Sequence, residues 1–215
     1  MNANTLKMAV VGANGRAGKL IVEEAMGRGI DVTAIVRGEN KTAAMKVVVK
    51  DALALEKSDL AGFDIVVDAV GGWTAETIGT IPAVAKHLAG ILSETATRLL
   101  VVGGAGSLFV NKEHTATVAD DPAFPADWKP LASAHSEALA ALRASKGVKW
   151  TYISPASDFR ADGPRTGEYI VGGEELTLSS KGVSVISYAD YAVAMVDEAA
   201  SAAPHIAQRI SVVER

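Results

Sequence analysis

The chain has 215 residues, of which 49% are hydrophobic and 21% charged, a composition typical of one well-buried globular domain. A net charge of -4 gives no basic surface for nucleic acid, and the absence of cysteine excludes disulfides, thiol catalysis and cysteine-ligated metals. No run approaches about 18 apolar residues, and the N-terminal segment lacks the features of a secretory signal, so we expect a cytoplasmic protein without a membrane partner.

Short β-rich runs alternate with longer helical patterns along the chain. Most of these runs are continuously apolar, which is typical of strands covered on both faces in a parallel sheet. The predicted strands are residues 7–12, 31–37, 46–51, 64–70, 98–104, 149–155 and 209–214.

The predicted helices are residues 16–28, 74–93, 133–146 and 187–201, with Gly29 as a C-terminal cap of the first and Ser187 as N-cap of the last. This alternation predicts an α/β fold with a doubly wound parallel sheet, a Rossmann fold, in a single domain over residues 1–215. Two long irregular stretches, 106–130 and 156–176, follow strand ends, where such sheets bind ligands, and we expect them to be substrate loops.

The sequence "VVGANGRAG" places Gly12, Gly15 and Gly18 where the first strand hands over to the first helix. In such a turn the first glycine permits the tight bend, the second exposes the backbone to a pyrophosphate, and the third lets the helix pack on the strand. The helix N-terminus then binds the phosphates. The pattern therefore predicts a dinucleotide-binding unit; the alternative is a glycine-rich turn without a ligand.

Arg37 stands directly after the second strand, where an NAD-binding unit would carry Asp or Glu for the ribose 2′-hydroxyl. A guanidinium suits a 2′-phosphate, and Arg16 and Lys41 add positive charge nearby. We therefore expect NADP (NADPH), with NAD as the less favoured cofactor. The alternative is that Arg37 is an ordinary solvated residue.

Further cofactor contacts follow from the ends of the later strands. Asp51 is expected near the adenine, although it could instead cap the next helix, and Pro155 is expected under the nicotinamide. Ser107 is a candidate catalytic hydroxyl, and a plain turn role stays equally open. The remaining predicted contacts are Val70, Gly71, Gly72, Gly103 and Gly104.

Together "VVGANGRAG", "AIVR", "RLLVVGGAGSL", "KWTYISPASDF", "RTGEY" and "SYADYAVAMVDE" resemble the NmrA-like atypical short-chain dehydrogenases/reductases. Within that family the resemblance is greatest to bacterial proteins named NADH-flavin reductases, relatives of biliverdin-IXβ/flavin reductase. It spans nearly the whole chain and implies a Rossmann fold and a nicotinamide cofactor. Asn14 stands where the family usually has threonine; asparagine tolerates unusual backbone angles and can bond a local amide, so we expect cofactor binding to survive.

Ordinary short-chain dehydrogenases use a Tyr-x-x-x-Lys pair, whose positions are held here by Leu131 and His135. A tyrosine acid is therefore missing, which argues against sugar epimerase and alcohol dehydrogenase chemistry. Hydride transfer to a flavin or quinone does not need that acid, because the acceptor delocalises the incoming charge.

We therefore predict an NAD(P)H-dependent reductase with FMN, FAD or a quinone as substrate; the alternative is a non-catalytic redox sensor. His135 is the second candidate catalytic residue, with helix packing as the alternative role. Arg160 and Arg165 are candidates for an anionic acceptor group; the alternative is that they are ordinary solvated loop residues. Aromatic side chains in the two loops, Tyr169 among them, are candidates for contact with the acceptor. The other histidines lack ligand spacing, so we expect no metal, and either a monomer or a homodimer.

Overall fold

The computed structural model describes residues 5–215, so the first four residues of the N-terminal segment considered above lie outside it. One eight-stranded sheet has the order β3-β2-β1-β4-β5-β6-β10-β8, and β7 and β9 form a separate pair. The strands are β1 (Lys7–Val11), β2 (Asp31–Val36), β3 (Lys46–Val49), β4 (Ile65–Asp68), β5 (Arg98–Val102), β6 (Lys149–Ser154), β7 (Asp158–Arg160), β8 (Tyr169–Gly172), β9 (Val185–Ser187) and β10 (Gln208–Glu214).

Seven strands of the large sheet are parallel, and β8 alone runs antiparallel, against β10. The order reverses at β1, with β2 and β3 on one side and β4, β5 and β6 on the other. Ligands bind at such a switch point, outside the carboxyl ends of the strands. The predicted Rossmann fold is confirmed, and so is each of the seven predicted strands.

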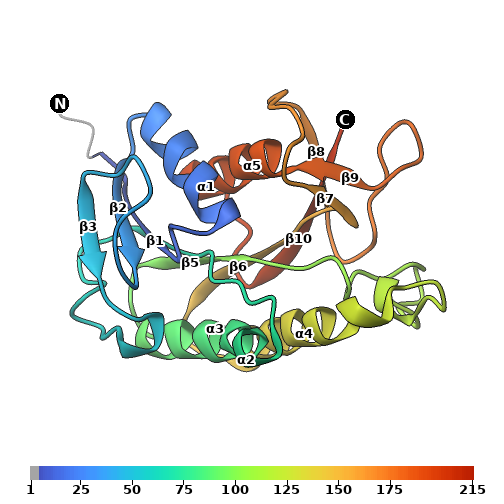
Figure 1. The fold of residues 1–215 in the computed structure, drawn as a ribbon, viewed down its shortest axis with the longest axis horizontal. Helices are drawn as coiled ribbons and strands as arrows, with labels where there is room; N and C mark the ends of the chain where they lie inside the picture. The colour runs from blue at the N-terminus through green and yellow to red at the C-terminus, as the bar shows by residue number, and fades with distance from the viewer. Residues whose placement is uncertain (1–4) are drawn as a thin grey trace.

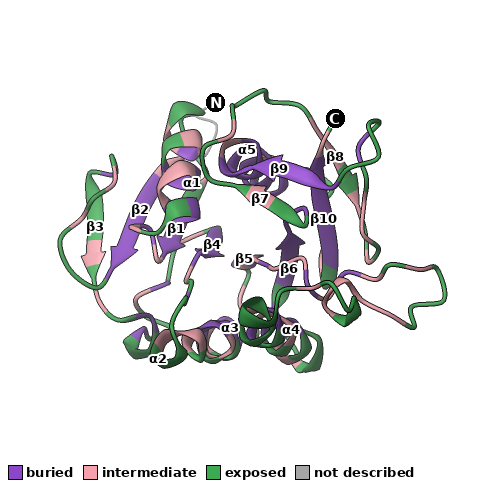
Figure 2. Cartoon of the chain, turned by 45° about the vertical axis from the view of Figure 1, so that its right-hand side comes forward, coloured by how far each residue is buried: buried purple, intermediate pink, exposed green. Residues whose placement is uncertain are grey.

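Helices cover both faces of the sheet (Figure 1). One layer holds α1 (Arg16–Gly27) and α5 (Tyr188–Ala200); the other holds α2 (Ala75–Ile78), α3 (Thr80–Ile91) and α4 (Lys129–Ala144). Short 3-10 helices are Ala52–Ala54, Val118–Asp120 and Ala126–Trp128. Buried residues lie along the strands and the inner helix faces (Figure 2), and their side chains form an apolar core on each side of the sheet.

Several boundaries differ from the predicted ones for local physical reasons. The helix predicted over 74–93 is divided at Gly79 into α2 and α3. The helix predicted over 133–146 begins earlier, at Lys129, because Pro130 lies in its first turn, where a missing N–H costs nothing. The predicted loop 156–176 contains β7 and β8, whose pairing partners are far away in the sequence.

Both predicted helix caps are confirmed. Gly29 has a positive φ of 75° and donates its N–H to the Met26 carbonyl at 2.9 Å, which ends α1. The Ser187 side chain accepts a hydrogen bond from the Asp190 N–H at 2.9 Å, which begins α5.

Candidate cofactor-binding site

The glycine loop after β1 makes a tight turn that only glycine permits. Gly12 has a φ of 75°, and its N–H donates to the carbonyl of Ile35 in β2 at 3.0 Å. A Cβ on Gly18 would lie 2.6 Å from the Gly12 carbonyl oxygen, so α1 packs against the turn more closely than any side chain allows. The turn and packing roles predicted for the first and third glycines are therefore present.

The N-terminus of α1 is open to an anion. Gly15 is its N-cap, no side chain caps the first turn, and that turn contains no acidic residue. The Gly15 N–H donates to the Gly12 carbonyl at 2.9 Å, whereas the N–H groups of Arg16, Ala17 and Gly18 have no hydrogen-bond acceptor within residues 5–215. A dinucleotide pyrophosphate fits this arrangement, because unpaired helix N–H groups and the helix dipole both favour negative charge.

Asn14 connects the glycine loop to the segment after β2. Its amide donates to the Glu39 carbonyl at 2.8 Å, and its side-chain oxygen accepts from the Lys41 N–H at 2.7 Å. Asn14 therefore positions the segment that carries Arg37 and Lys41. The exposed Arg37 side chain makes no hydrogen bond or ion pair within residues 5–215. It is a cation at the end of β2 that is available to a phosphate.

The end of β4 carries a buried acid that the sequence analysis did not single out. Asp68 is 3% exposed and accepts a hydrogen bond from the Val70 N–H at 3.0 Å. Burial raises the pKa of this carboxyl to about 7. Because Asp68 holds the segment that continues into Gly71 and Gly72, it shapes the predicted nicotinamide side of the site. An acid ending the apolar run "IVVD" was the signal available in the sequence.

Trp73 is a second feature that sequence reasoning missed. It is 68% exposed, at the end of the segment after β4, and the Arg16 guanidinium lies 6.0 Å from the centre of its ring. The Arg16 charge also acts on Tyr188, whose pKa is raised by burial and lowered in part by Arg16. Arg16 thus stands at the start of α1 between two aromatic side chains from distant segments.

Tyr152 and His135 support the glycines after β5. The Gly104 N–H donates to the Tyr152 hydroxyl at 3.0 Å, and that hydroxyl donates to the His135 carbonyl at 3.0 Å. A Cβ on Gly104 would lie 2.8 Å from the His135 ring, and one on Gly103 would lie 2.4 Å from the Tyr152 ring. Burial lowers the pKa of His135 to about 4, so the imidazole is neutral at pH 7, and its Nδ1 has no partner among the described residues.

Ser107 is partly buried, and both its carbonyl oxygen and its hydroxyl accept hydrogen bonds from Arg209 of β10, at 2.8 and 3.0 Å. Pro155 is buried directly after β6. Asp51 is exposed and accepts from the Leu53 N–H at 2.9 Å, so its side chain caps the 3-10 helix, the alternative noted for it above.

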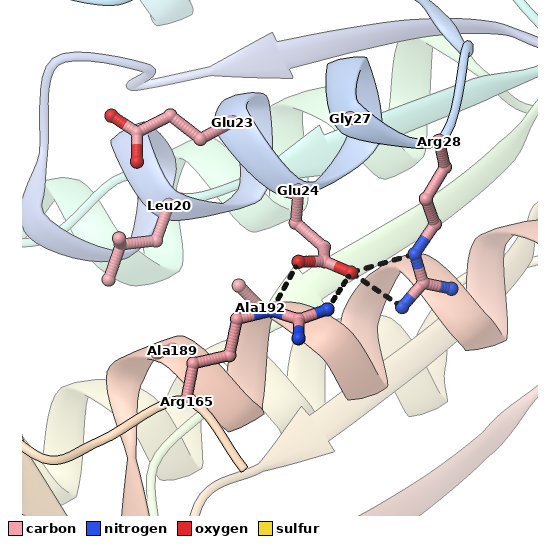
Figure 3. A pocket seen from close by; sticks show the side chains of 8 residues that line it. All are labelled: Leu20, Glu23, Glu24, Gly27, Arg28, Arg165, Ala189 and Ala192. Atoms are coloured by element: carbon pink, nitrogen blue, oxygen red, sulfur yellow. Dashed lines mark hydrogen bonds and ion pairs between the residues drawn. The ribbon is translucent and has the colours of Figure 1, made fainter. Parts of the chain in front are cut away.

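The two arginines of the loop 156–176 that are candidates for an anionic acceptor group each pair with a carboxylate of the chain. Arg160 pairs with Asp158 at 2.7 Å. Arg165 reaches across to α1 and pairs with Glu24 at 2.9 Å, at the edge of a cavity of about 460 Å³ between α1 and α5 (Figure 3). The Tyr169 hydroxyl, from the same loop, donates to Asp197 at 2.6 Å. Arg165 and Tyr169 therefore fasten the loop to the α1/α5 layer.

No group of three or more histidine, aspartate and glutamate side chains within residues 5–215 is arranged to hold a metal ion. In the same part of the chain, every helix is too short or too polar to cross a lipid bilayer.

The glycine turn and the open helix N-terminus lie at the carboxyl end of β1, where the strand order of the parallel sheet reverses. This combination is typical of a dinucleotide-binding α/β protein. The sequence pattern of the NAD(P)H-binding family matches residues 12–199, and the chain belongs to this family. The resemblance stated from the sequence is thereby confirmed at the level of family and fold.

Relatives of known structure or sequence cover almost the whole chain. A Streptococcus pneumoniae structure described as a "putative NADH-flavin reductase" is 48% identical, covers 98% of this chain and 100% of its own, and has a TM-score of 0.94. A Bacteroides thetaiotaomicron structure described as a "putative epimerase" is 32% identical, covers 98% of each chain, and has a TM-score of 0.85. The Bacillus subtilis protein YwnB, named uncharacterized, is 42% identical over 90% of this chain and 92% of its own.

Proposed function

We propose that the protein is an NADPH-dependent reductase that passes a hydride to a flavin, a quinone or a similarly conjugated acceptor. The observation that carries this proposal is the chemistry at the sheet edge. The cofactor side has an open helix N-terminus and the unpaired Arg37, whereas the α4 positions of the usual acid pair hold Leu131 and the neutral His135.

The chain's own groups bind and orient rather than donate protons. The Tyr152 hydroxyl lies beside the glycines after β5, but it already accepts from the Gly104 N–H and donates to the His135 carbonyl, and burial raises its pKa above the ordinary value. A bound nicotinamide would supply a hydride. The chain would hold the two ring systems face to face and exclude water, which favours acceptors that need no acid at the moment of transfer.

We assign the cofactor contacts to the first turn of α1 and the glycine loop for the pyrophosphate, to Arg37 for the 2′-phosphate, and to the segments after β4, β5 and β6 for the nicotinamide. Ser107 and His135 are the polar groups that we propose on the acceptor side. The name of the Streptococcus pneumoniae relative supports a flavin acceptor, while it specifies NADH. Our preference for NADPH rests on Arg37, because a guanidinium matches a phosphate better than a hydroxyl.

The test is oxidation of NADPH, with NADH in parallel, by purified protein given riboflavin, menadione or no acceptor. We expect rapid, acceptor-dependent loss of NADPH absorbance and slower loss with NADH. Tight NADPH binding without turnover on either acceptor would contradict the reductase and favour a dinucleotide sensor. If Arg37→Ala is inactive at low NADPH concentration but regains turnover at high concentration, the variant has lost cofactor affinity and not the chemical step.

A further inference from the structure

Arg209 is a buried cation that the sequence analysis did not single out. It lies in β10, beside Tyr152 of β6 in the parallel register, and its side chain is 0% exposed. Removing a charge from water is costly unless the charge is paired and hydrogen-bonded, and an apolar side chain often replaces such a pair without loss of stability. A buried arginine beside the predicted acceptor loops therefore calls for a specific role.

The guanidinium connects the two loops. Nη1 donates to the Ser107 carbonyl at 2.8 Å and to the Ser107 hydroxyl at 3.0 Å, in the loop after β5. Nη2 donates to the Glu174 carbonyl at 2.9 Å and to the Glu174 carboxylate, in the loop after β8. Glu174 also accepts from Arg143 of α4 at 2.7 Å. The centre of the Phe109 ring lies 5.6 Å from the same guanidinium.

The bond to Ser107 has only one possible direction. A guanidinium has donors and no acceptor, so the Ser107 oxygen must accept, and its own proton is left for another partner. Ser107 makes no second side-chain hydrogen bond within residues 5–215. A hydroxyl that accepts from a cation is also a stronger donor, because neighbouring hydrogen bonds polarise one another.

We propose that Arg209 is a positioning residue that holds Ser107 as a hydrogen-bond donor to the hydride acceptor. This inference rests on the proposed reductase function. When NADPH is oxidised to NADP+, the acceptor gains a hydride, that is two electrons and one proton, and negative charge develops on a carbonyl oxygen or ring nitrogen. The Ser107 hydroxyl stabilises that charge by a hydrogen bond, and solvent supplies the second proton.

A purely structural role, in which Arg209 only fastens the two loops, predicts a different result. In that case Arg209 and Ser107 would contribute independently to the acceptor reaction. A double-mutant cycle separates the two roles, because residues that act as a unit give non-additive losses. The variants are Ser107→Ala, Arg209→Gln and both together. Arg209→Lys is a milder change that keeps the charge and one donor nitrogen.

We expect Ser107→Ala and Arg209→Gln each to lower kcat/KM for menadione by about 10-fold, and the double variant to lose no more than Arg209→Gln alone. Arg209→Lys should fall between wild type and Arg209→Gln. The Kd for NADPH should stay unchanged throughout. If the fold-losses in kcat/KM of the two single variants multiply in the double variant, or if Ser107→Ala keeps full activity, the proposal is overturned.

The matched control is Arg98→Gln, since Arg98 is also largely buried and paired with a buried carboxylate, Glu198, at 2.6 Å, but lies at the opposite ends of the strands. It should lower the free energy of unfolding and leave kcat/KM for menadione unchanged. If wild type shows no turnover, the proposed function fails, and the same cycle is measured on menadione binding to the NADP+-bound protein. Additive losses in that binding cycle would then reject the inference separately.

Discussion

The cofactor side and the acceptor side lie at the carboxyl ends of the parallel strands and use charge in opposite ways. On the cofactor side, around β1, β2 and α1, the site consists of backbone N–H groups and Arg37, which has no partner among the described residues. On the acceptor side, the arginines around the two loops are all paired with carboxylates: Arg143, Arg160, Arg165 and Arg209. The first side is therefore open to an anionic ligand, whereas the second uses its arginines to hold loops.

The largest effect should come from the backbone of the cofactor side. Gly18→Ala places a Cβ 2.6 Å from the Gly12 carbonyl oxygen, so either the turn or α1 must shift. We expect a loss of about 3 kcal/mol in the free energy of unfolding, together with weaker NADPH binding, because overpacking against backbone cannot be relieved by a side-chain rotation. Urea denaturation and NADPH titration measure the two effects.

Gly27→Ala, in the same helix, is the matched control. A Cβ there meets nothing within 4 Å, so this change should stabilise the protein by about 0.5–1 kcal/mol by reducing the freedom of the unfolded chain. Equal behaviour of the two alanine variants would show that close packing at Gly18 is not required.

A second test concerns Asp68, which lies between the two sides at the end of β4. Its pKa is about 7 in the folded protein and 3.8 as the ordinary value, so the folded chain binds more protons between these pH values. The free energy of unfolding should therefore fall as pH rises from about 4 to about 7. Asp68→Asn keeps an acceptor for the Val70 N–H and should remove this slope.

The variant should consequently be more stable than wild type at pH 8, by about 2–4 kcal/mol. Denaturant unfolding at pH 5 and pH 8 measures the difference. An identical pH slope in both proteins would mean that Asp68 is not the group that titrates.

The third test addresses the unpaired cation directly. Arg37→Ala should weaken NADPH binding by about 1.5–3 kcal/mol, the range for hydrogen bonds to charged groups, and should barely change NADH binding. Arg160→Ala removes an arginine that is paired with Asp158 and should leave both cofactor affinities as they are. Equal losses for NADPH and NADH in Arg37→Ala would refute the NADPH assignment.

The smallest effect is expected on the acceptor side. Because its arginines are already paired, a flavin phosphate should meet only exposed groups, whose ion pairs contribute about 0–1 kcal/mol. Riboflavin and FMN should therefore have similar kcat/KM values as acceptors, within roughly fivefold. A strong preference for FMN that disappears in Arg165→Ala would show that Glu24 releases this arginine in solution.

The sequence was sufficient for the parts of the molecule that depend on local pattern. Continuously apolar runs predicted the seven parallel strands, since a strand covered on both faces has no polar side to alternate with. The spacing of Gly12, Gly15 and Gly18 predicted the turn into α1, because positive φ and close packing are properties of those positions themselves. The edge strand β8 was missed, because it is short and its pairing with β10 is set by contacts far along the chain.

Only the tertiary structure decided which charged side chains are free. Arg165 and Glu24 are 141 residues apart, and Arg209 and Ser107 are 102 apart, so no window of sequence shows that they meet. From the sequence, both Arg37 and Arg165 were candidates to bind an anion, the first a 2′-phosphate and the second an acceptor group. In the fold, Arg37 has no partner among the described residues, whereas Arg165 lies against the Glu24 carboxylate. The sequence does not show this difference, because an ion pair depends on distance in space and not on distance along the chain.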